Sequence, residues 1–349
     1  MQKKIKAPHT SRRPTMTDVA KAASVSQSTV SMVLNNMAGA RLSDQTRARV
    51  LSIAMELGYR LPRRDPEVAL TSSVQSGRRL IAYLVDELST SPHPVQSVDG
   101  ARDAAWEHDC LLSVAVTRGN PEQAEALIDS YKAHPQLLGF IYSTIFTRQV
   151  QVPASLAGVP TVLLNCHDAN FAGYAIGPSE LAGGHSATEY LLAKGHSRIG
   201  FINGEPWMEA AKDRLKGYRR ALATFDIAYD PGLVRDGDWN TSSGYAATIG
   251  LMQSDKPPSA IFCANDLMAI GALDALHAMG KQIPGDVAVI GYDDQEIAQH
   301  TRPALTTVLL PNYEMGRCAL ETLLEIEQKT NTRHKLIKIE CPIVERESA

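Results

Sequence analysis

The sequence is poor in the features that mark secreted and membrane proteins. Its cysteines are odd in number, far apart and never in a C-x-x-C pair, so we expect reduced thiols and neither a disulfide framework nor a metal site (Cys110, Cys166, Cys263, Cys318 and Cys341). No stretch approaches the roughly 18 apolar residues of a membrane span. The first twenty residues are basic and polar, without the apolar core of a signal peptide. The expected location is therefore cytoplasmic.

The sequence also lacks the short motifs of common enzymes. G-x-G-x-x-G, G-x-x-x-x-G-K-[ST], G-x-S-x-G and H-E-x-x-H are all absent, and the ten histidines are scattered. Asp293 and Asp294 are adjacent, but neighbouring side chains at a strand end point in different directions and cannot flank one bond. We therefore expect no catalytic activity, no cofactor and no metal.

Charge is unevenly distributed along the chain. The 349 residues include 35 Lys and Arg against 38 Asp and Glu, a net charge of −3, with 44% hydrophobic residues, as in a soluble globular protein of two or three domains. Residues 1–64 hold 12 basic and 3 acidic residues, a net of +9, which leaves 23 against 35, or −12, for residues 65–349. This asymmetry predicts a small basic module on a larger acidic body.

The basic module has the pattern of a helix-turn-helix. Thr15 and Asp18 have the spacing of an N-cap and an acid near the helix start, which predicts a short helix through about Ala23. Residues 24–25 make the turn, and Ser26 can cap a second helix with inward positions at Val30, Val33 and Leu34. A third helix is expected after the cap Ser43, ending near Gly58, with an apolar stripe of Val50, Ile53, Ala54 and Leu57.

Two interpretations of these helices compete. One is a small helical bundle with a solvated basic face, and the other is a DNA reader whose second helix enters the major groove. Short polar residues at the outer start of the second helix favour the DNA reader, because Gln can pair with adenine and hydroxyl groups commonly hold phosphates (Gln27, Ser28, Thr29 and Ser31).

The module resembles the LacI/GalR family of transcriptional regulators. The matching patterns are T-x-x-D-V-A-x-x-A at 15–23, V-S-x-x-T-V-S at 25–31, S-x-x-T-R-x-x-V at 43–50 and A-x-x-L-G-Y at 54–59. The resemblance implies base reading by Gln27, Ser28 and Met32. It implies phosphate or groove contacts by Ser26, Thr29, Ser31 and Asn35, to which we add Thr15 and Thr17. Met32 departs from the Arg or His common in the family, so it offers apolar contact and no Arg-to-guanine pair.

Residues 60–79 form a compositional break rich in Pro, Arg and Ser, which predicts a linker. Asp65-Pro66-Glu67 has the character of a helix start. In the family a hinge helix here folds on operator DNA and inserts a Leu into the minor groove. The usual motif N-x-x-A-R-x-L is absent, so Leu70 is the candidate wedge, with Val74 second. An ordinary flexible tether is the alternative.

The remaining residues alternate apolar strands with helical stretches, which predicts parallel sheets covered on both faces. Strands are expected at 80–85, 111–116, 138–142, 161–165, 199–202, 260–263 and 287–292, with helices at 98–108, 121–134, 180–194 and 214–225. The expected fold class is α/β, with an all-α helix-turn-helix head, a hinge and two Rossmann-like subdomains. Ligands of such sheets bind beyond the carboxyl ends of the strands.

This body also resembles the family, and with it the periplasmic sugar-binding proteins. The matching segments include KGHSRIGFINGEP (194–206), AIFCANDLMAIGA (260–272), VIGYDD (289–294), RPALTTV (302–308) and VERES (344–348). The expected domains are residues 1–62 as the head, ordered from about 15, and 63–79 as the hinge. One subdomain is expected at 80–178 plus about 309–335, and the other at 179–308 plus about 336–349.

Several residues just past strand ends are expected to hold an effector in the cleft between the subdomains. Arg214, Asn265 and Asp293 match the family's polar contacts and can satisfy neighbouring hydroxyls of a polyol. Trp207 and Trp239 can offer aromatic faces to a sugar, although a Trp is more often part of a core. Asp86, Ser91 and His93 could close over the ligand, with solvated loop residues as an equal alternative. Asp294 is expected to orient its loop, and Asp266 to cap a helix at Leu267.

Together these features predict a sequence-specific DNA-binding regulator, a repressor that acts as a homodimer on a pseudo-palindromic operator. A small molecule, a mono- or disaccharide, is expected to control operator affinity by closing or rotating the two subdomains. A transporter's solute-binding protein is one alternative, opposed by the helix-turn-helix and the missing signal peptide. A sugar-modifying enzyme is another, opposed by the absent catalytic motifs.

Overall fold

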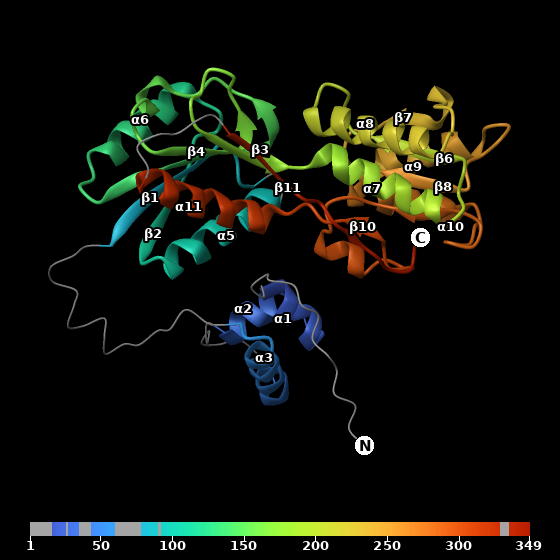
Figure 1. Cartoon of the computed structure of the whole chain (residues 1–349). Coiled ribbons are helices and arrows are strands. Elements are labelled where there is room, and N and C mark those ends of the chain that lie inside the picture. Colours follow the sequence, from blue (N-terminus) through green and yellow to red (C-terminus); the bar gives the residue numbers. More distant parts are fainter. Residues whose placement is uncertain (1–15, 26, 35–42, 60–77, 90–91, 329–334) are drawn as a thin grey trace. The chain divides into compact units, whose positions relative to one another are not determined.

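The computed structural model describes residues 16–25, 27–34, 43–59, 78–89, 92–328 and 335–349 (Figure 1). The chain forms two compact units, Met1–Gly77 and Arg78–Ala349, which are considered separately. The predicted contacts Thr15, Ser26, Asn35, Leu70 and Ser91 lie outside the described residues, as do Val74 and the expected helix start at 65–67.

The described residues of the head form three helices, α1 (Met16–Ala23), α2 (Gln27–Leu34) and α3 (Asp44–Glu56). Its core consists of apolar residues from all three helices: Val19, Ala20, Ala23, Val30, Val33, Leu34, Val50 and Ala54. The predicted cap Ser43 is confirmed, because its Oγ accepts a hydrogen bond of 3.2 Å from the Thr46 amide.

One predicted core position of the head is wrong. Leu57 is 41% exposed, although it continues the apolar stripe of α3. The helix ends before it, and Gly58 follows with a φ of +72°, a conformation that suits glycine. The reversed chain brings Tyr59 onto the core in place of Leu57, with the Tyr59 amide donating to the Ala54 carbonyl at 2.8 Å.

The first half of the body is built on a six-stranded parallel sheet. Its strand order is β11-β5-β4-β3-β1-β2, from the edge strand β11 to the opposite edge β2. The strands are β1 (Arg79–Val85), β2 (Cys110–Val116), β3 (Leu137–Gln149), β4 (Thr161–His167), β5 (Tyr174–Pro178) and β11 (Lys335–Ile339). Helices α5 (His93–Glu107) and α11 (Asn312–Gln328) pack side by side on one face, and α6 (Pro121–Lys132) covers the other (Figure 1).

The second half contains a four-stranded parallel sheet of order β7-β6-β8-β9. The strands are β6 (Ile199–Asn203), β7 (Val234–Asp236), β8 (Ala260–Cys263) and β9 (Ala288–Ile290). Helices α7 (Glu180–Ala193), α8 (Glu209–Thr224), α9 (Thr241–Met252) and α10 (Asp266–Ala278) form one apolar core with this sheet. The α7–α8 and α9–α10 pairs pack closely.

The chain passes between the two halves three times. It crosses after β5, again after the short strand β10 (Thr307–Val308), and finally after β11, to reach β12 (Ile343–Val344), which pairs antiparallel with β10. Because β11 pairs with β5 in the first sheet as far as Ile339, the last crossing lies after that residue and not at about residue 336. The residues of β11 alternate in type and are largely exposed, so the sequence contains no apolar run here that would predict a buried strand.

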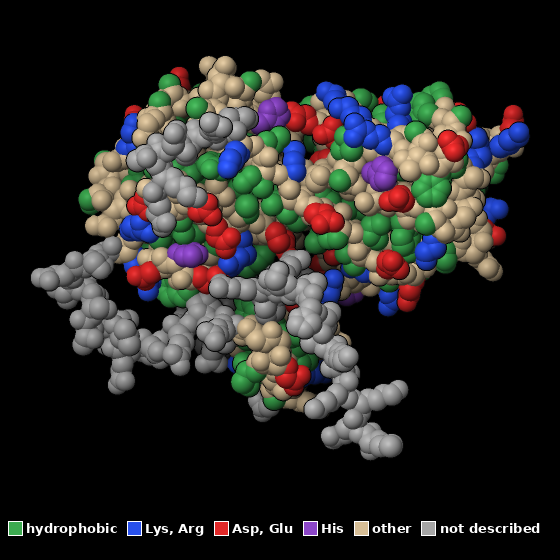
Figure 2. All heavy atoms as spheres, viewed as in Figure 1, with side chains coloured by type: hydrophobic (Ala, Val, Ile, Leu, Met, Phe, Trp, Pro, Cys, Tyr) green, Lys and Arg blue, Asp and Glu red, His purple; other side chains and the backbone are tan. Residues whose placement is uncertain are grey.

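All seven expected strands and all four expected body helices are present; β8 has the expected bounds and the others have shifted ends. The strands that the pattern missed, β5, β7, β10, β11 and β12, are short. Figure 2 shows acidic and basic side chains interspersed on the face of the body in view, with Lys and Arg side chains over α8. None of the helices in the described residues is long and apolar enough to cross a membrane.

Candidate functional site

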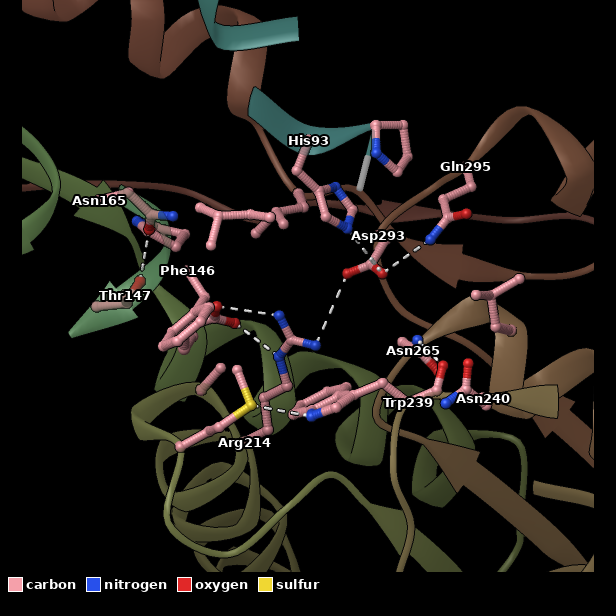
Figure 3. Close-up of a pocket in the computed structure, with 18 residues that line it drawn as sticks. His93, Phe146, Thr147, Asn165, Arg214, Trp239, Asn240, Asn265, Asp293 and Gln295 are labelled. Carbon is pink, nitrogen blue, oxygen red and sulfur yellow. Dashed lines mark hydrogen bonds and ion pairs between the residues drawn. The ribbon is translucent and has the colours of Figure 1, made fainter. Parts of the chain in front are cut away.

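A cavity of about 280 Å³ lies where the carboxyl ends of the two parallel sheets meet (Figure 3). The first half contributes Pro92, His93, Ile145, Phe146, Thr147 and Asn165, and the crossing segments contribute Pro178, Glu180 and Leu310. The second half contributes Met208, Ala210, Arg214, Trp239, Asn240, Asn265, Leu267, Asp293 and Gln295. This is the edge at which parallel sheets bind ligands.

Arg214 on α8 is held rigidly at the floor of the cavity. Its Nε donates to Glu180 Oε2 at 2.7 Å and its Nη2 to Glu180 Oε1 at 3.0 Å, and its Nη1 donates to the Ala264 carbonyl. The guanidinium lies 3.6 Å from the ring centroid of Tyr292. Burial by itself would lower the pKa of Arg214, but the neighbouring groups, the charges of Glu180 and Asp293 and the hydrogen bonds to Glu180 among them, together outweigh burial and raise the pKa above its ordinary value.

Asp293 lies beside this arginine and faces both halves of the body. One carboxylate oxygen is 3.7 Å from Arg214 Nη1, and the other is 3.4 Å from His93 Nε2 and accepts from Gln295 Nε2 at 3.3 Å. Asn312 Nδ2 lies 3.2 Å from His93 Nδ1, on the opposite side of the ring from Asp293. These long contacts leave acceptor capacity on Asp293 for a ligand's hydroxyl groups.

Trp239 forms one aromatic wall of the cavity. Asn265 caps α10 by accepting from the Met268 amide at 2.9 Å, and its Nδ2 donates to the Trp239 carbonyl at 2.9 Å. The Trp239 indole Nε1 donates to Met208 Sδ at 2.9 Å (Figure 3). The ring also lies where a Cβ on Gly204 would clash at 1.9 Å, so a glycine is needed beneath it. These contacts fix the plane of the indole.

The opposite wall comes from the ends of β3 and β4. Thr147 Oγ1 donates to Asn165 Oδ1 at 2.6 Å, and Asn165 Nδ2 donates to the Thr144 carbonyl at 3.1 Å. Phe146 contributes an aromatic ring next to them (Figure 3). The site therefore combines two aromatic residues with groups that donate, accept or do both.

Three residues of the cavity lining have their backbone in the left-handed region. Asn165, Trp239 and Asp293 have φ values of 59°, 67° and 112°, in the region that favours glycine. Such conformations cost about 1–3 kcal/mol each and persist where the surroundings impose them, frequently at functional sites.

The structure brings together most of the predicted effector residues. His93, Arg214, Trp239, Asn265 and Asp293 all line the cavity. Trp207 does not line it and is 58% exposed, with its ring edge-on to Phe146.

Asp86 is the other predicted residue that does not line the cavity. It is buried, accepts from the Ile145 amide and pairs with Arg148 Nη2 at 2.8 Å, and its burial raises its pKa. It therefore holds the C-terminal part of β3 in place and presents no free carboxylate to the cavity.

Asp294 and Asp266 were both expected to have structural roles near the cavity, and the structure agrees with only one of the two expectations. Asp294 pairs with Arg346 in the C-terminal VERES segment, which agrees with the expected loop-orienting role. The capping role expected for Asp266 is wrong, because Asn265 is the cap. Asp266 accepts instead from Thr307 Oγ1 at 2.6 Å and from the Gln295 amide at 2.8 Å.

Sequence reasoning missed several residues that line the cavity, Phe146, Thr147, Glu180, Asn240 and Gln295 among them. Asn165 could have been found, because it ends an expected strand at the ligand-binding edge. Phe146 and Thr147 could not, because β3 runs seven residues past the expected end at Tyr142.

The predicted DNA-contacting residues that fall in the described part of the head lie on its first two helices. Gln27, Ser28, Thr29, Ser31 and Met32 belong to α2, and Thr17 belongs to α1. The tight turn between the helices is closed by a hydrogen bond of 3.1 Å from the Val25 amide to the Ala20 carbonyl. Fold and cavity thus define a helix-turn-helix protein with a ligand-binding α/β body.

Comparison with known proteins agrees with this class. Residues 15–61 match the bacterial regulatory proteins of the lacI family, and residues 188–349 match a periplasmic binding protein-like domain. The ribose operon repressor of Haemophilus influenzae is 30% identical over 338 residues, covering 96% of this chain and 98% of the relative. The transcriptional regulator CelR of Thermobifida fusca is 32% identical over 349 residues, covering 97% and 98%.

Solved structures give the same result over nearly the whole chain. A complex of CelR with cellobiose has a TM-score of 0.64 at 31% identity and covers 97% of this chain and 100% of that one. The Lac repressor dimer bound to operator and the anti-inducer ONPF has a TM-score of 0.65 at 26% identity, covering 97% and 99%.

The chain therefore belongs to the LacI family of bacterial transcriptional regulators. Its relatives are DNA-binding regulators and not enzymes, so the prediction of a regulator without catalytic activity is confirmed.

Proposed function

We propose that this protein is a homodimeric repressor whose affinity for a pseudo-palindromic operator is controlled by a mono- or disaccharide bound in the cavity of its body. The cavity itself carries this proposal. It places acceptor, donor and amide groups around a space with aromatic rings on two sides. Such a regulator works in the cytoplasm, where its DNA is.

The chemistry of the lining favours a carbohydrate. A sugar hydroxyl both donates and accepts, so a ring with several hydroxyls needs partners of both kinds. Asp293 supplies acceptors, the remaining N–H groups of Arg214 supply donors, and Asn165 and Asn265 can supply either. Trp239 and Phe146 cover the apolar C–H surface of such a ring. The volume of about 280 Å³ suits a small ligand, because it lies near the lower end of the roughly 300–1,000 Å³ of ligand pockets.

The position of the cavity supports allosteric control. Its lining comes from both sheets, so a ligand that contacts both changes the free energy of closing one half on the other. Coupling between effector and operator is reciprocal and typically worth about 1–3 kcal/mol. Sugar affinity measured with and without operator DNA must therefore differ by the same factor as operator affinity measured with and without sugar.

The head supplies the DNA contacts in this proposal. Gln27, Ser28 and Met32 read bases from α2, with Thr15, Thr17, Ser26, Thr29, Ser31 and Asn35 on phosphates or in the groove, and Leu70 enters the minor groove. An operator selected from random DNA, followed by gel-shift titration, tests these roles. We expect Gln27→Ala to cost about 1–3 kcal/mol of specific binding. Unchanged affinity in Leu70→Ala, with loss in Gln27→Ala, would exclude the wedge.

The effector is tested separately, by titrating the intrinsic tryptophan fluorescence of the full chain with D-ribose, D-glucose, cellobiose, adenine and hypoxanthine. Binding of a sugar with a changed operator affinity supports the proposal. Binding of a purine alone would contradict it.

A further inference from the structure

A short segment of the second half, between β6 and the first turn of α8, lines the cavity and also contacts the first half of the body. Along this segment the side chains alternate, with Met208 and Ala210 lining the cavity. Trp207 and Glu209, which alternate with them, contact the other half. Residues 207–209 are called the gate below.

Glu209 makes the strongest of these contacts. Its Oε1 accepts from the Gln149 amide at 3.0 Å, and His167 Nε2 lies 2.9 Å from Oε2 and 3.1 Å from Oε1. Gln149 and His167 are the last residues of β3 and β4, so one carboxylate of the second half ties together two strand ends of the first.

Trp207 adds an aromatic contact beside this carboxylate. Its ring meets Phe146 edge to face, with centroids 5.7 Å apart and planes at 75°. Phe146 lines the cavity, whereas Trp207 does not. The aromatic pair therefore extends from the cavity lining to the surface, with Phe146 as its inner member and the exposed Trp207 as its outer one.

The gate contacts the first half only through non-covalent interactions, unlike the three crossing segments. The crossings after β5, β10 and β11 connect the halves through the main chain and cannot separate. The contacts of Trp207 and Glu209 can break when the halves move apart. A second polar contact across the cavity, between His93 and Asp293, is longer at 3.4 Å.

We infer that the gate determines which effectors the cavity accepts: it encloses a single small sugar, must open for that sugar to exchange, and excludes sugars that carry a large substituent. This inference rests on the proposed function. An enclosed ligand leaves only when the cleft opens, so contacts that hold the gate shut act on the dissociation rate more than on the association rate.

The first experiment measures sugar dissociation from the full-length protein by stopped-flow tryptophan fluorescence, with D-ribose and D-glucose as probes and with cellobiose, which the gate should exclude, as the third sugar. Glu209→Ala and His167→Ala should each raise the dissociation rate constant on the order of fivefold, as loss of a partly exposed ion pair would. The double variant should be no faster than Glu209→Ala, because the contact that His167→Ala removes is already lost in Glu209→Ala. Additive effects, or unchanged rates in both single variants, would overturn the gate.

Asp213→Ala is the matched control for this experiment. Asp213 also lies on α8, but its carboxylate pairs within that helix, with Lys216 Nζ at 3.0 Å. We expect its dissociation rate constant to equal that of the wild type. If Asp213→Ala raised the dissociation rate constant as much as Glu209→Ala does, loss of any acidic side chain on α8 would speed dissociation. That result would contradict a specific role for the gate.

The second experiment tests size exclusion. The wild type should bind 4-nitrophenyl β-D-glucoside at least tenfold more weakly than D-glucose, and Trp207→Ala should reduce that ratio by removing the outer ring of the gate. Equal affinity of the wild type for the two compounds would overturn the size limit.

A measurement without sugar separates failure of the gate from failure of the proposed function. If none of the three sugars binds, the proposed function fails for them, and the gate is judged by hydrogen exchange in the unliganded full chain. The Gln149 amide, which donates to Glu209, should exchange on the order of fivefold faster in Glu209→Ala than in the wild type. Equal exchange would overturn the gate whatever the effector is.

Discussion

Arg214 and Glu180 form a buried, two-pronged ion pair although 34 residues separate them in the chain. Glu180 opens α7 and Arg214 lies one turn into α8, and both side chains are about 5% exposed or less. The pair links the close packing of these two helices to the floor of the cavity.

Removing Glu180 should strongly destabilise the protein, because it leaves the Arg214 charge buried without its main partner. We expect Glu180→Ala to lose about 3–5 kcal/mol of the free energy of unfolding of the body. Urea unfolding followed by circular dichroism measures this. Glu189→Ala, at a more exposed acid on the same helix, is the control and should stay within about 0.5 kcal/mol of the wild type. Similar losses in both variants would contradict the role given to the pair.

Substitutions of Asp293 and Asp294 should have different effects, one on sugar affinity and the other on stability. Asp293→Asn removes a charged acceptor from the cavity, so sugar affinity measured by calorimetry should fall by about 10- to 150-fold, the value of a hydrogen bond to a charged group. Asp294→Asn breaks the pair with Arg346 outside the cavity. It should lower the midpoint of unfolding and leave sugar affinity unchanged. An equal loss of affinity in both variants would show that only the loop conformation matters.

Asp266 should make stability depend on pH. Burial, with the nearby charge of Asp293, raises its pKa well above the usual value for an aspartate. The folded state therefore holds this proton more tightly than the unfolded chain does. The stabilising contribution is complete below the unfolded pKa, near 3.8, and is lost as the pH rises through the folded pKa.

Asp266→Asn removes this titration and can keep both hydrogen bonds, by accepting from the Gln295 amide and donating to Thr307. The free energy of unfolding of the variant should therefore improve relative to the wild type between pH 4 and pH 8. Urea unfolding at several pH values gives this difference. Asp274→Asn, at an exposed position of the same helix, is the control. A difference that does not change with pH would contradict the raised pKa.

Gly184 should be required where α7 crosses α8. A Cβ at this position would lie 2.5 Å from the carbonyl oxygen of Arg214, so Gly184→Ala must push the helices apart. We expect a loss of about 1–3 kcal/mol in the free energy of unfolding. Gly250→Ala in α9 meets nothing closer than 3.8 Å and should gain up to about 1 kcal/mol from helix propensity. Thermal unfolding of the two variants gives the contrast, and equal changes would contradict it.

Much of the architecture could be predicted from the sequence. The first two head helices and the apolar strands of the body follow patterns that are local in the chain, because burial of one helix face or of a whole parallel strand imposes a periodicity. The prediction that Leu57 belongs to the core was wrong, because Gly58, in the left-handed conformation just after α3, changes the direction of the chain. The sequence pattern did not predict β11, because this edge strand is half exposed and therefore needs no apolar run.

The sequence by itself determined which chemical groups this protein can use. It has a helix-turn-helix head with net charge +9, and Arg214, Asn265 and Asp293 are placed after strands, where parallel sheets bind ligands. Only the tertiary structure decided which of those groups meet. Asp86 pairs with Arg148 instead of lining the cavity, Glu180 pairs with Arg214, and Glu209 of the second half contacts His167 of the first half. The physical reason is that strand and helix patterns report which side chains are buried, whereas pairing between residues far apart depends on how the elements pack.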